Sequence, residues 1–263
     1  MVQAVQARDV VLDGTRTAII VPVISPDPDD LRAHSARARE SSSVDLLEWR
    51  VDALFDAASD AHDDDGSAAE RVATCARAVR AGAADLPVLA TVRSAQEGGP
   101  VALTAAQRVD AHELLLGTGA ADLLDVEVLA DAGAARASID AAHDHGVPVV
   151  GSHHRFDATP SVRDMVDALM RIRSHGADLV KLAVMPRSAH DVVALLEATV
   201  EARAQLDVPL IMIAMGPLGL LSRCSGAVFG QAATFASLGA ESAPGQLDAT
   251  EMAHVLRVLG ARP

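Results

Sequence analysis

The chain contains one lysine, Lys181, among 22 basic residues, and all the others are arginine. Lys181 lies in an apolar run, residues 179–185, between Gly176 and Pro186, and such a run is typical of a buried strand. A guanidinium cannot be deprotonated in a protein, whereas a buried lysine can lose its proton and act as a nucleophile. We therefore expect Lys181 to supply an amine that forms a Schiff base with a carbonyl compound.

Two simpler interpretations of this lysine remain open. A lysine can extend its ammonium along apolar surface to reach water, and a buried lysine can be one half of an ion pair. Lysine is absent from every predicted exposed helix, so the chain does not use it as an ordinary surface cation.

Several other apolar runs also end in polar side chains. Strand residues alternate in direction, so residues two apart share a face. Bringing many charged strand ends to one place would be costly without a polar ligand, and the pattern therefore predicts a binding or catalytic site. The polar residues concerned are Glu48, Arg50, Arg93, Glu97, Asp125, Glu127, His154 and Lys181, and the apolar residues Phe156 and Met215 lie at the same strand ends.

Each of these residues also has a structural interpretation. Glu48 and Arg50 could form a structural ion pair, and His154 could be a hydrogen-bonded core histidine. Asp125 and Glu127 are expected to be supporting hydrogen-bond acceptors. His153 lies on the opposite face of its run from His154, so we expect a structural role for it.

Eight apolar runs alternate with Ala-rich helical segments along the chain. This alternation predicts a parallel sheet with helices outside it. Eight repeats in 263 residues favour a closed (β/α)8 TIM barrel. The active site of such a barrel lies at the C-terminal ends of its strands. We predict an α/β fold with a single barrel domain over residues 1–263 and a hairpin around Asp13-Gly14 that could close the bottom of the barrel. Thr104, Ser161 and Ser188 are expected helix N-caps. The predicted strands are residues 17–24, 44–51, 87–93, 121–128, 148–153, 179–185, 209–215 and 226–229, and the predicted helices are 29–41, 68–82, 104–117, 131–145, 161–175, 188–205 and 248–259.

The charge and composition exclude some classes of protein. The net charge of −14 and the pI near 5.0 argue against nucleic-acid and anionic-membrane partners. Cys75 and Cys224 form no CxxC pair, which excludes a cysteine-based zinc site. Neither a signal peptide nor a transmembrane run is visible, so we expect a cytoplasmic location.

The motifs together resemble the type I 3-dehydroquinate dehydratase family of the shikimate pathway. The resemblance spans residues 48 to 246. It rests on the segments 48–52, 91–94, 97–99, 152–160 and 180–183, and most specifically on the segment 215–246, which contains Ser222-Arg223, Phe229-Gly230, Thr234-Phe235 and 242–246.

The resemblance implies a (β/α)8 barrel that converts 3-dehydroquinate to 3-dehydroshikimate without a metal or an organic cofactor. It implies that Lys181 forms the Schiff base, that His154 is the general acid and base, and that Glu97 positions His154. It also implies a homodimer. The remaining roles that it implies are carboxylate binding by Arg223, contacts to ring hydroxyls by Glu48, Arg50, Arg93, Ser242 and Gln246, and a pocket wall of Phe156, Met215 and Phe235.

Two positions depart from the family pattern. Arg155 stands where aspartate is common, and Pro217 stands where lysine is common. Three alternatives also remain: another Schiff-base barrel lyase such as a class I aldolase, a non-catalytic ligand-binding barrel, and a catabolic role in quinate breakdown that uses the same chemistry.

Overall fold

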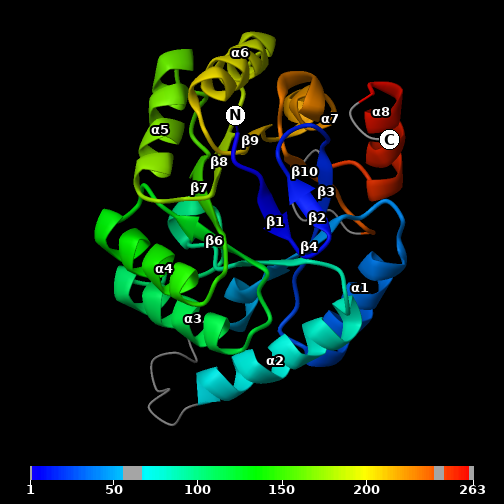
Figure 1. The fold of residues 1–263 in the computed structure, drawn as a ribbon, viewed down its shortest axis with the longest axis vertical. Helices are drawn as coiled ribbons and strands as arrows, with labels where there is room; N and C mark the ends of the chain where they lie inside the picture. Colours follow the sequence, from blue (N-terminus) through cyan, green and yellow to red (C-terminus); the bar gives the residue numbers. More distant parts are fainter. Residues whose placement is uncertain (1, 56–66, 240–245, 261–263) are drawn as a thin grey trace.

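The computed structural model describes residues 2–55, 67–239 and 246–260, and its centre is a barrel of parallel strands (Figure 1). The strands follow the order β10, β3, β4, β5, β6, β7, β8, β9. The amide of Ala232 donates to the carbonyl of Leu210 at 2.9 Å, which brings the chain before β10 against β9 and nearly closes the barrel. The predicted barrel fold is therefore confirmed. The strands are β3 (Ala18–Val23), β4 (Leu46–Arg50), β5 (Val88–Thr91), β6 (Leu123–Glu127), β7 (Val149–Arg155), β8 (Leu179–Val184), β9 (Leu210–Ala214) and β10 (Ala233–Phe235).

The helices surround the barrel (Figure 1). Thr104, Ser161 and Ser188 are N-caps as expected, and each hydroxyl accepts a backbone amide of the first helical turn. The short helix α7 was not predicted, because five residues are too few for a periodic pattern. Within the described ranges, no helix has the length and apolar character needed to cross a bilayer. The helices are α1 (Pro28–Glu40), α2 (Ser67–Ala83), α3 (Ala105–Gly117), α4 (Ala132–Asp144), α5 (Val162–Ser174), α6 (Ala189–Gln205), α7 (Leu220–Cys224) and α8 (Ala249–Val258).

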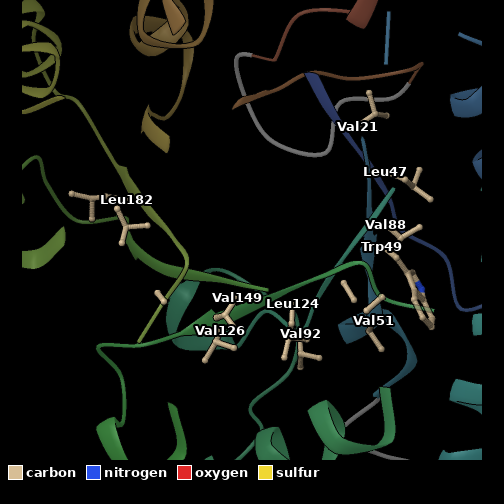
Figure 2. Packing of buried hydrophobic residues seen from close by; sticks show 14 of the residues in the cluster. Val21, Leu47, Trp49, Val51, Val88, Val92, Leu124, Val126, Val149 and Leu182 are labelled. Carbon is tan, nitrogen blue, oxygen red and sulfur yellow. The ribbon is translucent and has the colours of Figure 1, made fainter. Parts of the chain in front are cut away.

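A layer of apolar side chains lies between the barrel and the helices, and Figure 2 shows part of it around Trp49. Trp49 is fully buried in this layer. Because side chains alternate along a strand, the outward direction of Trp49 turns Glu48 and Arg50 toward the barrel interior. The apolar layer therefore fixes which face of each strand carries the polar residues.

The N-terminal hairpin closes one end of the barrel. Val5 and Leu12, on β1 (Val5–Ala7) and β2 (Val10–Leu12), pack with Ile20 and Leu46 near the starts of the barrel strands. This end is opposite the C-terminal ends of the strands, so the hairpin lies at the bottom of the barrel as the sequence suggested.

The predicted position of the hairpin turn was wrong. The turn is Arg8-Asp9, where Arg8 has a φ of 49° and its guanidinium contacts Asp122 Oδ1 at 2.8 Å. Asp13-Gly14 forms the next turn, in which Asp13 Oδ1 accepts the amide of Thr15 at 2.8 Å. An Asp side chain that binds the amide two residues on makes a turn of its own, and here that turn leads from the hairpin to β3.

The predicted eighth strand was also wrong. Residues Gly226–Phe229 form a 3-10 helix, η5, and the strand is Ala233–Phe235, which pairs with β3. A Cβ at Gly226 would lie 2.1 Å from Thr17 Oγ1, so this glycine serves close packing and does not mark the start of a strand. The four-residue apolar run was too short to distinguish a strand from a helical turn.

We expect Leu12→Ala to lower the free energy of unfolding by about 2–5 kcal/mol, because it would empty a buried site between the hairpin and the barrel. Val11→Ala is the matched control: Val11 is on the same strand but 39% exposed, whereas Leu12 is 1% exposed. The control should change the free energy of unfolding by no more than about 0.5 kcal/mol. Urea denaturation measures both values, and equal effects would contradict the packing assigned to the hairpin.

Candidate active site

A cavity of about 350 Å³ opens at the C-terminal ends of the barrel strands. It brings together the catalytic and substrate-binding residues that the resemblance implies and that the structure describes; Ser242 lies outside the described residues. Asp125 and Glu127 do not line the cavity, and they contact Lys181 and Arg93 in its wall. Ile213 also lines it and was not anticipated, although it could have been found by counting two residues back from Met215. The cavity is lined by Glu48, Arg50, Arg93, Glu97, Gly98, His154, Phe156, Lys181, Ala183, Met185, Ile213, Met215, Gly216, Arg223, Phe235 and Gln246.

Lys181 projects from β8 into this cavity and is only 4% exposed. Its Nζ lies 3.3 Å from Asp125 Oδ2 and 4.5 Å from the centre of the Phe235 ring. The side chain therefore does not extend to bulk water. Lys181 is therefore one half of a buried ion pair with Asp125. Because the amine also faces the cavity, a ligand in the cavity can reach it.

Asp125 is the buried partner of this lysine. Burial alone would raise the pKa of its carboxyl, but Arg93, Lys181 and a hydrogen bond from Ser152 outweigh burial and lower that pKa to about 2. Asp125 is thus a permanent carboxylate beneath the amine. The expected supporting role for Asp125 agrees with these contacts.

The Arg93 guanidinium at the end of β5 is surrounded by protein acceptors. Burial alone would lower its pKa, but four nearby carboxylates raise it, so the guanidinium stays charged. The sequence pointed to substrate contact for Arg93, and the structure gives it a dense set of internal contacts as well as a place in the cavity wall. Its acceptors are Asp125 Oδ1 at 2.8 Å, Glu127 Oε1 and Ser152 Oγ at 3.1 Å, and Glu97 Oε2 at 3.5 Å.

His154 and Glu97 form a hydrogen-bonded pair. His154 Nδ1 lies 2.8 Å from Glu97 Oε2, and the backbone amide of His154 donates to the same oxygen at 3.0 Å. A carboxylate at Nδ1 fixes the tautomer that carries its proton there, and this leaves the Nε2 lone pair available as a base. Burial, followed by the charges of Arg93 and Lys181, lowers the pKa of His154 well below 6.5.

Glu97 follows β5 in the 3-10 helix η3 (Ala95–Glu97) and is 4% exposed. Burial raises the pKa of its carboxyl, and the hydrogen bond from His153 and the charge of Arg93 oppose that rise. The contact with His153 was not anticipated. His153 points to the other face of β7, but the loop that carries Glu97 reaches over the end of the strand and contacts both imidazoles.

Arg223, on α7, is a second buried cation in the cavity wall. It is 3% exposed, and its Nε has no hydrogen-bond partner among the described residues. Burial lowers its pKa to about 10. A buried guanidinium with a free donor fits an anionic group, and its planar fork matches a carboxylate.

Glu48 and Arg50 lie on β4 at the cavity wall, but each has another partner. Glu48 Oε1 accepts the hydroxyl of Thr91 at 2.9 Å. Arg50 binds both oxygens of Asp52, at 2.8 and 2.9 Å. The suggested ion pair is therefore formed by Arg50 with Asp52, and Glu48 keeps its second oxygen for other contacts.

Phe156 covers one side of the cavity entrance and requires a glycine opposite it. Gly98 has a φ of 85°, and a Cβ there would lie 2.3 Å from Phe156 Cζ. The two departures from the family pattern are outside the cavity lining: Arg155 pairs with Asp157 at 2.8 Å, and Pro217 begins η4 (Pro217–Gly219). Among the described residues, no group of three or more His, Cys, Asp or Glu side chains is placed to hold a metal ion.

The fold and the cavity together define a (β/α)8-barrel enzyme. A family model for type I 3-dehydroquinase matches residues 19–263. A 3-dehydroquinate dehydratase of Salmonella typhimurium is 37% identical over 258 residues, covering 98% of each chain. A solved type I 3-dehydroquinate dehydratase of Clostridium difficile, with covalently modified comenic acid, has a TM-score of 0.89 at 32% identity and covers 98% of each chain. The enzyme of Geobacillus kaustophilus also has a TM-score of 0.89, at 36% identity, over 98% of this chain and 96% of that one.

The chain belongs to the type I 3-dehydroquinase family and is a hydro-lyase. This membership favours dehydration over the aldolase and the non-catalytic barrel that the sequence left open.

If His154 is the catalytic base, its depressed pKa predicts the pH profile of the enzyme. A base must be neutral to accept a proton, and His154 becomes protonated only when the pH falls well below 6.5. We expect kcat/KM to stay level as the pH falls from 7 through 6.5 and to decline only below that, since this ratio reports the free enzyme. Circular dichroism at each pH separates the decline from unfolding. A midpoint at or above 6.5 would contradict the buried environment of His154.

Proposed function

We propose that the enzyme dehydrates 3-dehydroquinate to 3-dehydroshikimate through a Schiff base on Lys181, with His154 as the general acid and base. The observation that carries this proposal is the convergence of a buried primary amine, a histidine–carboxylate pair and a buried arginine in one cavity. The family supports the reaction, and the geometry supports the roles of the residues.

The covalent step begins at the substrate ketone. The Lys181 amine adds to the carbonyl carbon, and protonation of the resulting hydroxyl releases water and leaves an iminium. The iminium withdraws electrons more strongly than the ketone, so it acidifies the neighbouring C–H. The Nε2 of His154 then removes that proton and gives an enamine.

Elimination follows from the enamine. Its electrons reform the iminium as the β-hydroxyl leaves, and His154 returns its proton to the departing oxygen as water. Addition of a water molecule to the iminium then releases the conjugated product and regenerates the amine. One imidazole suffices because it accepts one proton and donates one proton in each elimination.

The other cavity residues position the substrate in this proposal. Arg223 binds the carboxylate, because its free Nε and fixed charge are otherwise uncompensated. Phe156, Met215 and Phe235 form the apolar walls. The residues that contact the ring hydroxyls are Glu48, Arg50, Arg93 and Gln246 within the described part of the chain, and Ser242 outside it.

The test of the covalent step is reduction of the iminium. Borohydride added with 3-dehydroquinate should produce a stable secondary amine on Lys181, detected by mass spectrometry of the peptide that contains it. Lys181→Ala should give no such adduct and should lose activity in an assay for the conjugated enone. An unmodified Lys181 peptide recovered from enzyme that is turning over would refute the Schiff base.

Arg223→Lys tests the carboxylate site. Lysine keeps the charge but lacks the planar fork, so we expect KM to rise by about 10-fold, equivalent to the weakening of one charged hydrogen-bond pair, with a smaller change in kcat. Arg163→Lys is the matched control, because the Arg163 side chain is 90% exposed on α5. Steady-state kinetics gives the KM of both variants. If Arg223→Lys has the same KM as Arg163→Lys, Arg223 does not bind the substrate carboxylate.

Three sequence-based expectations stay predictions. They are the homodimer, the cytoplasmic location and the single domain over residues 1–263.

A further inference from the structure

A second cavity of about 340 Å³ lies on the other side of the Glu97 loop. It shares Glu97, His154 and Phe156 with the first cavity, and it adds the imidazole of His153. Neither this cavity nor His153 has a role in the mechanism proposed above. Its lining residues are Gln96, Glu97, Ala130, His153, His154, Arg155, Phe156 and Asp157.

The Glu97 carboxylate bridges two imidazoles. Its Oε1 lies 2.9 Å from His153 Nδ1, and its Oε2 lies 2.8 Å from His154 Nδ1. Oε2 has further donors in the His154 backbone amide and in Arg93, whereas the hydrogen-bond partner of Oε1 within the described residues is His153. The two oxygens are therefore held by different histidines from opposite faces of β7.

The terminal torsion of a glutamate is broad and nearly two-fold, so the carboxylate plane is set by its contacts and not by an intrinsic rotamer. The contacts on Oε2 hold one oxygen but allow the plane to turn about the bond that leads to the carboxyl carbon. A donor on Oε1 stops that rotation. His153 supplies this donor from outside the catalytic cavity.

We infer that His153 is a positioning residue that fixes the Glu97 carboxylate, so that the enzyme uses a His153–Glu97–His154 chain in place of a simple histidine–carboxylate pair. The inference rests on the proposed role of His154 as acid and base. His153 touches neither the substrate cavity nor Lys181 directly, and it acts through the orientation of Glu97.

The surroundings of His153 allow this role. Its side chain is 21% exposed, so the ring can reach the solvent of the second cavity while Nδ1 stays on Glu97. Arg155 and Asp157, the other charged residues that line this cavity beside Glu97 and His154, pair with each other at 2.8 Å. Glu97 is thus the charged group available to pair with His153.

The test compares His153→Ala with His153→Asn. The alanine variant removes the donor, and we expect kcat to fall by about 10-fold with little change in KM, equivalent to one hydrogen bond to a charged acceptor. The amide nitrogen of asparagine occupies nearly the same place as Nδ1, so His153→Asn should recover kcat to within about 3-fold of the original enzyme.

The control is His143→Ala. His143 Nε2 also contacts a carboxylate, Asp178 Oδ2 at 2.9 Å, but at the opposite end of the barrel. This variant should leave kcat unchanged. Thermal unfolding of all three variants shows whether a lower kcat reflects lost structure, and the asparagine variant provides the comparison if His153→Ala proves unstable.

The outcomes separate this inference from the proposed mechanism. If His153→Ala keeps full kcat, or if His153→Asn fails to recover it, His153 does not position Glu97, although borohydride would still trap Lys181. If borohydride fails to trap Lys181 in the unmodified enzyme, the Schiff base is wrong whatever the His153 variants show. The chain of three residues is supported if His153→Ala loses kcat, His153→Asn recovers it, and borohydride still traps Lys181 in the unmodified enzyme.

Discussion

The buried charge of Arg93 connects the charged residues of the site through its contacts with their carboxylates. Its guanidinium is buried just after β5 and contacts three carboxylates, one from η3 and two from β6. Through Asp125 it connects to the amine of Lys181, and through Glu97 it connects to the imidazole of His154. Removing one member of such a network would leave buried charge without compensation, a change that typically costs about 3–5 kcal/mol. The amine and the imidazole that the proposed mechanism uses are thus placed by the same cation.

The barrel supplies the geometry that this network requires. Each participating side chain comes from the inner face of a strand or from the loop that follows the strand, and alternation along the strands separates the polar inner face from the apolar outer face. Trp49 and its neighbours fix β4 from outside, and the N-terminal hairpin fills the opposite end of the interior. Polar groups are therefore confined to the upper part of the barrel, where a low-dielectric wall strengthens every charged contact.

Much of the fold could be predicted from periodicity. Seven of the eight barrel strands and the longer helices were found this way, because each has a clear apolar pattern over enough residues to show its period. The eighth strand was not found, since Ala233–Phe235 is short and contains small and polar residues, while residues 226–229 are more apolar but lie in a helical turn.

The members of the site were predictable because strand ends converge in a barrel, but their pairings were not. Arg50 pairs with Asp52 in place of Glu48, and His153 reaches Glu97 although it points away from the cavity. Both contacts depend on how a loop bends after its strand, and alternation along a strand contains no information on that bend.

The sole lysine has a consequence for the chemistry of the surface. Every other basic side chain is a guanidinium, so acylating reagents and acetyl-transferring enzymes find no lysine on any exposed face. The one lysine they could modify is the group at the centre of the barrel, and acylation would remove its charge and its nucleophilicity together. If Lys181 forms the proposed Schiff base, covalent labelling of this lysine and loss of turnover would proceed in strict proportion, and the modified fraction would measure the inactive fraction directly.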